Sequence, residues 1–310
     1  MRIIKIKYYF VIMLVFVLTA CSKDEVTNGT DISTPLDNLS TGSGLFSYTY
    51  EVVSFSKTMN VYYYIPPTKT ATTPILFVFH GTDRNAKDYR NAMLAKAEQL
   101  GFIVIVPEFS NQNFPNGDGY NLGNVFVDGD NPSPNTLNPE NKWTFSIIEP
   151  LFDFVKTQIN NTNTTYNIYG HSAGGQFAHR FLCFKPNARV NKTVASASGW
   201  YTVPDASINF PYGLNQSPII DLSLPNFLSK NVYIQVGVND DNPNDAGLRH
   251  NEYADAQGLN RKDRALYYFQ FCQQYAVTHT LPFNWSFHYI ENADHNYIQA
   301  SDKAATLLFN

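Results

Sequence analysis

The sequence predicts an α/β fold, and three observations lead to this prediction. Residues 75–79 and 102–106 are short, continuous apolar runs, which are typical of strands buried on both faces of a sheet. An amphipathic helical pattern over residues 86–100, closed by Gly101, separates the two runs. The chain has 310 residues, of which 44% are hydrophobic and 15% are charged, and this suffices for one large α/β domain.

The first 20 residues predict a targeting segment rather than part of the fold. A positively charged start, residues 1–7, precedes the apolar residues 8–17, which are too few to span a membrane comfortably. Residues 18–21 read Leu-Thr-Ala-Cys and resemble the lipobox of bacterial lipoproteins. This resemblance implies a lipoprotein signal peptide over residues 1–20 and lipidation of Cys21. It also implies that the protein is exported and that the lipid on its N-terminus anchors it to the outer membrane or cell surface. A plain signal peptide is the alternative.

Residues 21–44 are polar and predict a flexible tether, which leaves residues 45–310 as the folded domain. Two cysteines fall in this domain, Cys183 and Cys272. We expect buried free thiols, although export permits one disulfide. The formal net charge of -4 provides no basic surface for nucleic acid, so we expect no nucleic-acid partner.

Aromatic and β-branched residues over 48–55 and 60–65 predict an antiparallel hairpin at a sheet edge. Residues 107–141 are rich in Asn, Gly, Pro and Asp and predict a long loop after a strand. Open α/β sheets bind ligands at the carboxyl ends of their strands, so we expect this loop to form part of the wall of a substrate site. The loop contains acidic residues, including Asp118, Asp128 and Asp130. Their spacing does not match that of an EF-hand calcium loop, so we expect no metal site.

The pattern of apolar residues predicts the remaining elements. These are strands over residues 166–169, 192–198, 231–236 and 284–290, helices over 142–160, 176–185 and 297–308, a loop or cap over 210–224, and a long aromatic helix within 246–277. We expect the basic residues of the last helix on its solvated face, namely Arg261, Lys262 and Arg264. Trp200 and Tyr201 follow a strand end and either line a substrate pocket or belong to the core.

Residues 170–174 read Gly-His-Ser-Ala-Gly between a predicted strand and a predicted helix, which is the pattern of a nucleophile elbow. The tight turn strains the backbone of Ser172, and Gly170 and Gly174 supply the room that it needs. Such a turn exposes the Ser172 hydroxyl group. It also places the N–H of Ala173 at a helix N-terminus, where it can donate to a developing oxyanion. A Gly-rich turn with a purely structural role is the alternative.

Two further motifs accompany the elbow. A His-Gly pair, residues 80–81, follows an apolar run, and Asp294 with His295 follows the last predicted strand. Together with the elbow they resemble the α/β-hydrolase superfamily, near bacterial esterases of the polyhydroxybutyrate-depolymerase and feruloyl or acetylxylan esterase type. The resemblance covers most of residues 45–310. It implies an α/β-hydrolase fold with a mostly parallel central sheet and helices on both faces.

The same resemblance implies the partners of Ser172. His295, which follows the terminal strand, is implied as the general base. The carboxylate that orients it falls on Asp240, three residues past a Gly at a strand end, with Asp241 as the competitor. The chain order Ser, Asp, His is that of the superfamily.

In this superfamily the His-Gly pair opens the oxyanion loop, so the backbone N–H of Thr82, or that of Asp83, is implied as the second oxyanion donor. The sequence departs from the family in three ways. It lacks the Gly-Gly-Gly motif of lipases, it has no Gly before His295, and it shows no obvious cap domain. These departures leave the substrate class open.

The function that follows is a serine esterase, a hydrolase that cleaves carboxylic esters by two-step acyl transfer without a cofactor or a metal. Its expected partner is an ester substrate, either small or attached to a polymer. A serine peptidase on the same fold is one alternative, although such peptidases usually carry a large extra domain. A non-catalytic surface binding lipoprotein on a hydrolase scaffold is the other alternative.

Overall fold

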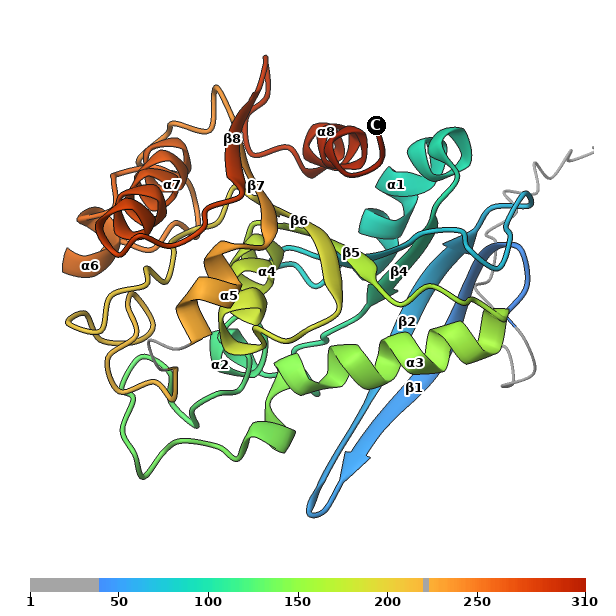
Figure 1. Ribbon diagram of the computed structural model, residues 1–310, viewed down its shortest axis with the longest axis horizontal. Helices are drawn as coiled ribbons and strands as arrows, with labels where there is room; N and C mark the ends of the chain where they lie inside the picture. The colour runs from blue at the N-terminus through green and yellow to red at the C-terminus, as the bar shows by residue number, and fades with distance from the viewer. Residues whose placement is uncertain (1–38, 220–222) are drawn as a thin grey trace, which may run out of the picture. The chain divides into compact units, whose positions relative to one another are not determined.

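The computed structural model describes residues 39–219 and 223–310 of the chain. The predicted signal peptide, Cys21 and most of the predicted tether lie outside the described residues. The described chain forms an α/β fold around one eight-stranded sheet with the order β1-β2-β4-β3-β5-β6-β7-β8 (Figure 1). No helix in the described ranges is long and apolar enough to cross a membrane.

The sheet is mostly parallel, as predicted. β1 and β2 form an antiparallel hairpin that pairs with β4, and every further pair of neighbours is parallel. The strands are β1 (Gly42–Val52), β2 (Phe55–Ile65), β3 (Ile75–Phe79), β4 (Ile103–Pro107), β5 (Tyr166–His171), β6 (Val190–Ser196), β7 (Asn231–Gly237) and β8 (Trp285–Ile290). Every residue of β3, β4 and β5 is buried, as the continuous apolar runs indicate.

Helices cover both faces of the sheet. α1 and α8 pack on one face, and α3, α4 and α7 pack on the other. The helices are α1 (Ala86–Leu100), α2 (Asn116–Gly119), α3 (Ile148–Ile159), α4 (Ala173–Phe184), α5 (Leu224–Leu228), α6 (Glu252–Asp255), α7 (Arg261–Thr278) and α8 (Tyr297–Phe309). Gly101 ends α1, as predicted, and donates its N–H to the carbonyl of Ala97. The other predicted elements are present with shifted ends.

The edge hairpin starts earlier than predicted. β1 begins at Gly42, so residues 42–44, which were expected in the tether, belong to the sheet. Gly44 pairs with Tyr63, and a Cβ at position 44 would lie 2.2 Å from the phenol ring. Gly and Ser lack the alternation of apolar residues that marks a strand, which is why the sequence did not reveal this pairing. The turn falls at residues 53–54.

The helix predicted over residues 142–160 is α-helical only from Ile148 onward. Before it the chain forms two short 3-10 helices, Glu140–Lys142 and Thr144–Ile147. A longer α-helix would need a hydrogen bond from the N–H of residue 150 to the carbonyl of residue 146, and Pro150 has no N–H. Proline is tolerated in the first turn of a helix, so α3 begins just before it.

The core beside α4 is aromatic. The ring of Phe177 lies 4.4 Å from that of Phe79, 4.9 Å from Phe145, 5.2 Å from Phe109 and 5.5 Å from Tyr120, measured between ring centroids. These contacts join α4 to β3 and to the long loop after β4. The helix that follows the elbow is therefore held on two sides by packed rings.

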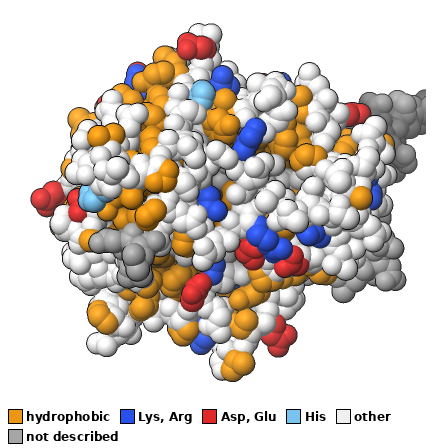
Figure 2. Space-filling view, viewed as in Figure 1, with side chains coloured by type: hydrophobic (Ala, Val, Ile, Leu, Met, Phe, Trp, Pro, Cys, Tyr) orange, Lys and Arg blue, Asp and Glu red, His pale blue; other side chains and the backbone are white. Residues whose placement is uncertain are grey.

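Apolar side chains also reach the surface near α6 and α7. Tyr253, Leu259, Val277 and Tyr289 are exposed. Figure 2 shows hydrophobic side chains gathered mainly on the left half of the drawn face, where Figure 1 places α6 and α7. Lys and Arg side chains on this face are interspersed with Asp and Glu. Single exposed apolar residues are common on soluble domains, so we assign them no partner.

Candidate active site

Ser172 occupies the turn between β5 and α4, as the elbow motif predicts. Its backbone has φ 58° and ψ -118°, a conformation that residues other than Gly rarely adopt. Its N–H donates to the carbonyl of Ser196 in the neighbouring strand β6, at 2.9 Å. The hydrogen bond and the packed helix hold the residue in a conformation that costs about 1–3 kcal/mol.

The glycines around Ser172 are required by close backbone contacts. A Cβ at position 170 would lie 2.0 Å from the carbonyl oxygen of Gly174, and one at position 174 would lie 1.9 Å from that of Phe79. At Gly175 it would lie 2.4 Å from the carbonyl oxygen of Ser196. Each contact is with backbone rather than with a flexible side chain, so no neighbour can move aside. Only glycine allows α4 to start this close to β3 and β6.

The imidazole of His295 hydrogen-bonds to the carboxylate of Asp240, with 2.7 Å between Nδ1 and Oδ2. Asp241, the alternative acid, is half-exposed and pairs with Lys262 at 2.6 Å. Because a carboxylate only accepts, Nδ1 carries the proton and Nε2 of the neutral ring is left as an acceptor. The His295 ring lies 4.6 Å from that of His171, the residue before Ser172.

Arg261 is buried against this acid, which corrects the expectation that it is solvated. Its guanidinium contacts the Asp240 carboxylate at 3.4 Å and also pairs with Asp245. Arg264 is fully buried as well and donates to the carbonyl of Gly199 at 2.6 Å. Positions 261 and 264 lie on one helix face with buried residues 265, 268 and 272. That spacing was the signal in the sequence that the positive charges concealed.

The His-Gly pair holds the loop that faces Ser172. His80 is buried, and its Nε2 accepts from the N–H of Phe109 at 3.1 Å, so its Nδ1 carries the proton and donates to the Gly81 carbonyl at 3.0 Å. Burial lowers the pKa of His80 to about 3 and keeps it neutral. The hydroxyl of Tyr120 donates to the His80 carbonyl at 2.7 Å. The long loop thereby secures the start of the oxyanion loop.

Thr82 and Ala173, the two predicted oxyanion donors, line the same cavity as Ser172 and His295. Ala173 is the first residue of α4, so its N–H has no partner within the helix. At Gly81 a Cβ would lie 3.8 Å from the Cβ of Ser172, which shows how closely the loop approaches the nucleophile. The two candidate donors and Ser172 thus line one cavity.

The cavity has a volume of about 1090 Å³, and residues from the long loop line it, as predicted. Trp200 lines it too, whereas Tyr201 is buried in the core with its ring 4.4 Å from that of Tyr268. Sequence reasoning did not single out several polar residues of the wall, among them Gln176 and, within the predicted loop, Asn121. Gln176 was detectable, because it lies four residues after Ser172 and so shares its helix face.

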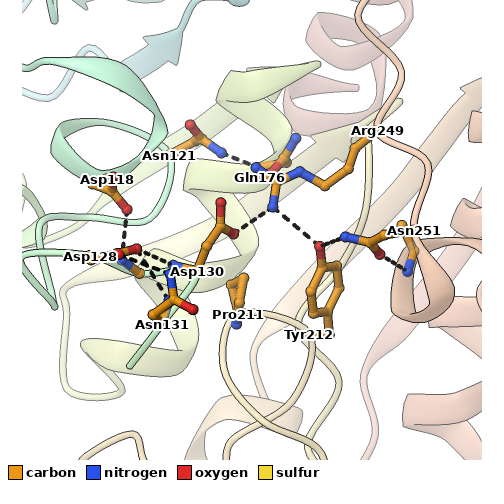
Figure 3. A network of polar contacts seen from close by, with 12 residues as sticks. Asp118, Asn121, Asp128, Asp130, Asn131, Gln176, Pro211, Tyr212, Arg249 and Asn251 are labelled. Carbon is orange, nitrogen blue, oxygen red and sulfur yellow. Dashed lines mark hydrogen bonds and ion pairs between the residues drawn. The ribbon is translucent and has the colours of Figure 1, made fainter. Parts of the chain in front are cut away.

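The acidic residues of the long loop form hydrogen bonds and ion pairs with other protein groups. Asp118 accepts from the N–H of Gly129 at 2.8 Å, and Asp130 pairs with Arg249 at 2.5 Å (Figure 3). In the described part of the chain, no group of three or more His, Cys, Asp or Glu is arranged to hold a metal ion.

Both cysteines of the domain are free and buried, as expected. Burial raises the pKa of Cys183 to about 12 and that of Cys272 well above its usual range. The two thiols therefore remain protonated at neutral pH and act as apolar core groups.

The elbow predicts a large difference between two glycine substitutions. Gly174→Ala places a methyl group 1.9 Å from a backbone carbonyl, so we expect it to abolish cooperative folding. Gly247→Ala is the control, because that position has φ 80° and a Cβ there would meet no neighbour within 4 Å. Only the backbone strain of about 1–2 kcal/mol then applies. Thermal unfolding followed by circular dichroism measures both. Similar melting temperatures for the two variants would contradict the steric argument.

The buried histidines predict acid sensitivity. Burial lowers the pKa values of His80, His171 and His179 below the usual 6.5. Below pH 6.5 the unfolded chain binds protons that the folded chain does not, so stability is complete above this pH and is lost as the pH falls toward the folded values. We expect the free energy of unfolding to fall by about 1.4 kcal/mol per pH unit for each imidazole, or about 4 kcal/mol between pH 6 and pH 5.

Urea titrations at pH 7, 6 and 5 measure this slope. His279→Gln, which removes an exposed imidazole at the end of α7, is the control and should keep the slope. A free energy of unfolding that stays constant from pH 6.5 to pH 5 would show that these imidazoles are not held neutral.

Comparison with known proteins places the chain. No protein-family model matches the sequence, and no curated protein matches it. Poly(aspartic acid) hydrolase-1 from Sphingomonas sp. KT-1 is a similar solved structure, with a TM-score of 0.81 and 36% identity over 88% of this chain and 100% of that chain. A poly(3-hydroxybutyrate) depolymerase from Bordetella parapertussis has a TM-score of 0.81 and 27% identity over 87% of this chain and 90% of its own.

An S-formylglutathione hydrolase from Agrobacterium tumefaciens, with a TM-score of 0.52 and 16% identity over 87% of this chain and 95% of that chain, shares the fold. These similarities confirm the resemblance on which the sequence analysis relied. Together with the sheet and the elbow, they show that the chain belongs to the α/β-hydrolase superfamily of serine esterase-like proteins.

Proposed function

We propose that the chain is a serine hydrolase that cleaves carboxylic esters by two-step acyl transfer. The observation that carries this proposal is the 2.7 Å hydrogen bond between Asp240 and His295, which lines the same cavity as the strained Ser172. In the neutral imidazole this bond keeps the proton on Nδ1, so that Nε2 can act as a base. The hydrolases among the similar structures support the same reaction class.

In the proposed reaction, Nε2 of His295 accepts the Ser172 proton as the serine oxygen attacks the ester carbonyl carbon. The Asp240 carboxylate stabilises the imidazolium that forms, and the N–H groups of Ala173 and Thr82 donate to the oxyanion. The imidazolium then gives its proton to the departing alcohol. Water, deprotonated by the same imidazole, then attacks the acyl-serine carbonyl carbon. The bond to the Ser172 oxygen breaks, the imidazolium returns the proton to this oxygen, and the acid is released.

We include polymers among the proposed substrates. The 27% identical structure is a poly(3-hydroxybutyrate) depolymerase, and a polyester is open to the same acyl transfer. The 36% identical structure is a poly(aspartic acid) hydrolase, which makes a polyamide the second candidate. A cavity of about 1090 Å³ is large for a short-chain ester alone. Incubation with each polymer, followed by measurement of the soluble fragments released, distinguishes the two.

We also propose that residues 1–20 are removed as a lipoprotein signal peptide and that Cys21 is lipidated. A tether after Cys21 would then connect the lipid to the folded domain, whose edge strand begins at Gly42. Cys21→Ser removes the acceptor thiol, so we expect the protein to move from the membrane fraction to the soluble exported fraction of bacterial cells. Membrane retention of this variant would contradict the anchoring.

The triad predicts graded losses of esterase activity. We expect Ser172→Ala and His295→Ala to reduce hydrolysis of p-nitrophenyl acetate and butyrate to background. Asp240→Asn should lower kcat by about 10⁴, because an amide that donates to Nδ1 selects the wrong tautomer. Asp241→Asn is the matched control and should stay near wild type, because Asp241 pairs with Lys262 at the surface.

Steady-state kinetics on variants with unchanged circular dichroism spectra make this comparison. A Ser172→Ala variant that keeps its activity would rule out the nucleophile. A folded but inactive wild type, not labelled by a fluorophosphonate, would favour a non-catalytic binding protein.

A further inference from the structure

Gln176 lies one helical turn after Ser172, and the proposed mechanism does not use its side chain. Its backbone N–H donates to the Ser172 carbonyl at 3.0 Å. The residue is only 5% exposed, and it lines the cavity that contains Ser172 and His295. The amide group is therefore part of the wall beside the nucleophile.

The orientation of this amide follows from its partners. Nη1 of Arg180 donates to Oε1 of Gln176 at 3.0 Å, and a guanidinium has only donors, so the atom facing it must be oxygen. Nδ2 of Asn121 donates to the same oxygen at 2.9 Å (Figure 3). Rotating the amide by half a turn would place its NH2 group against both donors. The NH2 group of Gln176 therefore points away from Arg180.

The NH2 group has no acceptor from the protein. Nε2 lies toward Gly199, where a Cβ would be 3.0 Å away, and within residues 39–219 and 223–310 no oxygen accepts from it. Nε2 is not one of the fully enclosed atoms without a partner, so it is accessible from the cavity that Gln176 lines. A donor held in a fixed direction at this wall can therefore bind an acceptor oxygen of a ligand.

Arg180 strengthens this donor. The guanidinium is fully buried, and in the described chain it donates to neutral oxygens: Oγ1 of Thr202 at 2.7 Å, the carbonyl of Asn121 at 3.1 Å and Oε1 of Gln176 at 3.0 Å. Burial lowers the pKa of Arg180 to about 9, so it still carries its charge at neutral pH. A cation bound to Oε1 draws electron density from the Gln176 amide and makes its NH2 group a better donor.

Trp200 and Arg249 hold the outer side of this arrangement. The centroid of the Trp200 ring lies near two guanidinium groups, 5.3 Å from that of Arg180 and 4.1 Å from that of Arg249. Arg249 in turn pairs with Asp130 and contacts the Tyr212 hydroxyl (Figure 3). Loops from three parts of the chain thus fix the wall around Gln176 before any substrate arrives.

We propose that the side-chain NH2 group of Gln176 donates a hydrogen bond to a second carbonyl-type oxygen of the substrate, distinct from the carbonyl that Ser172 attacks. The inference rests on the proposed function, because it defines this oxygen relative to the reacting ester. This hydrogen bond would favour substrates that have a keto, ester, amide or carboxylate oxygen near the cleaved bond. Plain alkyl esters lack such an oxygen, whereas polyesters and polyamides repeat one in every unit.

Gln176→Glu tests this inference in the otherwise unchanged full-length protein. Glutamate has nearly the same volume and keeps an oxygen for Arg180 and Asn121, but its other atom cannot donate. Two pairs of esters probe the two sides of the cleaved bond. They are p-nitrophenyl 4-oxopentanoate with p-nitrophenyl pentanoate, and 2-oxobutyl butyrate with butyl butyrate.

The readout is the ratio of kcat/KM for the oxo ester to kcat/KM for the plain ester. A general loss of activity lowers both values equally and leaves this ratio unchanged. We expect this ratio to fall about three- to tenfold in Gln176→Glu for at least one pair. Gln274→Glu, an exposed position on α7, is the matched control and should keep both ratios. Gln176→Met has a similar length and no donor, and it repeats the test if thermal unfolding shows that the Glu variant is not folded.

Unchanged ratios for both pairs, with wild-type turnover that Ser172→Ala abolishes, would overturn the role of Gln176 and leave the proposed function intact. Folded wild type that hydrolyses none of the four esters would overturn both.

Discussion

Backbone-to-backbone contact at the turn between β5 and α4 is the constraint on which the site depends. The glycines at positions 170, 174 and 175 allow the turn to touch backbone carbonyls closer than any Cβ permits. Because β3 and β6 lie on either side of β5, the turn is held from both neighbours. Ser172 keeps a strained conformation in this frame, and a candidate nucleophile held in this way would lose little entropy on reaction.

Charge is buried around the site in two different ways. Arg261 lies between the carboxylates of Asp240 and Asp245, so each buried charge has a partner of opposite sign. Arg180 instead relies on neutral oxygens, one of them the amide oxygen of Gln176. The first arrangement positions the acid behind the imidazole, and the second directs an amide donor into the cavity.

The histidines divide by burial. His80 and His179 are fully enclosed, and each accepts a backbone N–H at Nε2 and faces a backbone carbonyl with Nδ1, which ties a loop to the frame. The side chain of His295 is 26% exposed and is held by a carboxylate, a combination that permits proton exchange with a substrate. The same residue type thus provides both structural ties and the candidate base, according to its surroundings.

The sequence alone determined the α/β class, the buried parallel strands and the elbow, because continuous apolar runs and closely spaced glycines are local signals. Through the family resemblance it also predicted His295 and two candidate acids after strand ends. Only the tertiary structure decided between Asp240 and Asp241, since burial of one and exposure of the other depend on how α7 packs. For the same reason the sequence misjudged Arg261 and Arg264 and missed Gln176. Their partners include residues 16 to 65 positions away in the chain, and the helical spacing that places them on a buried face does not identify those partners.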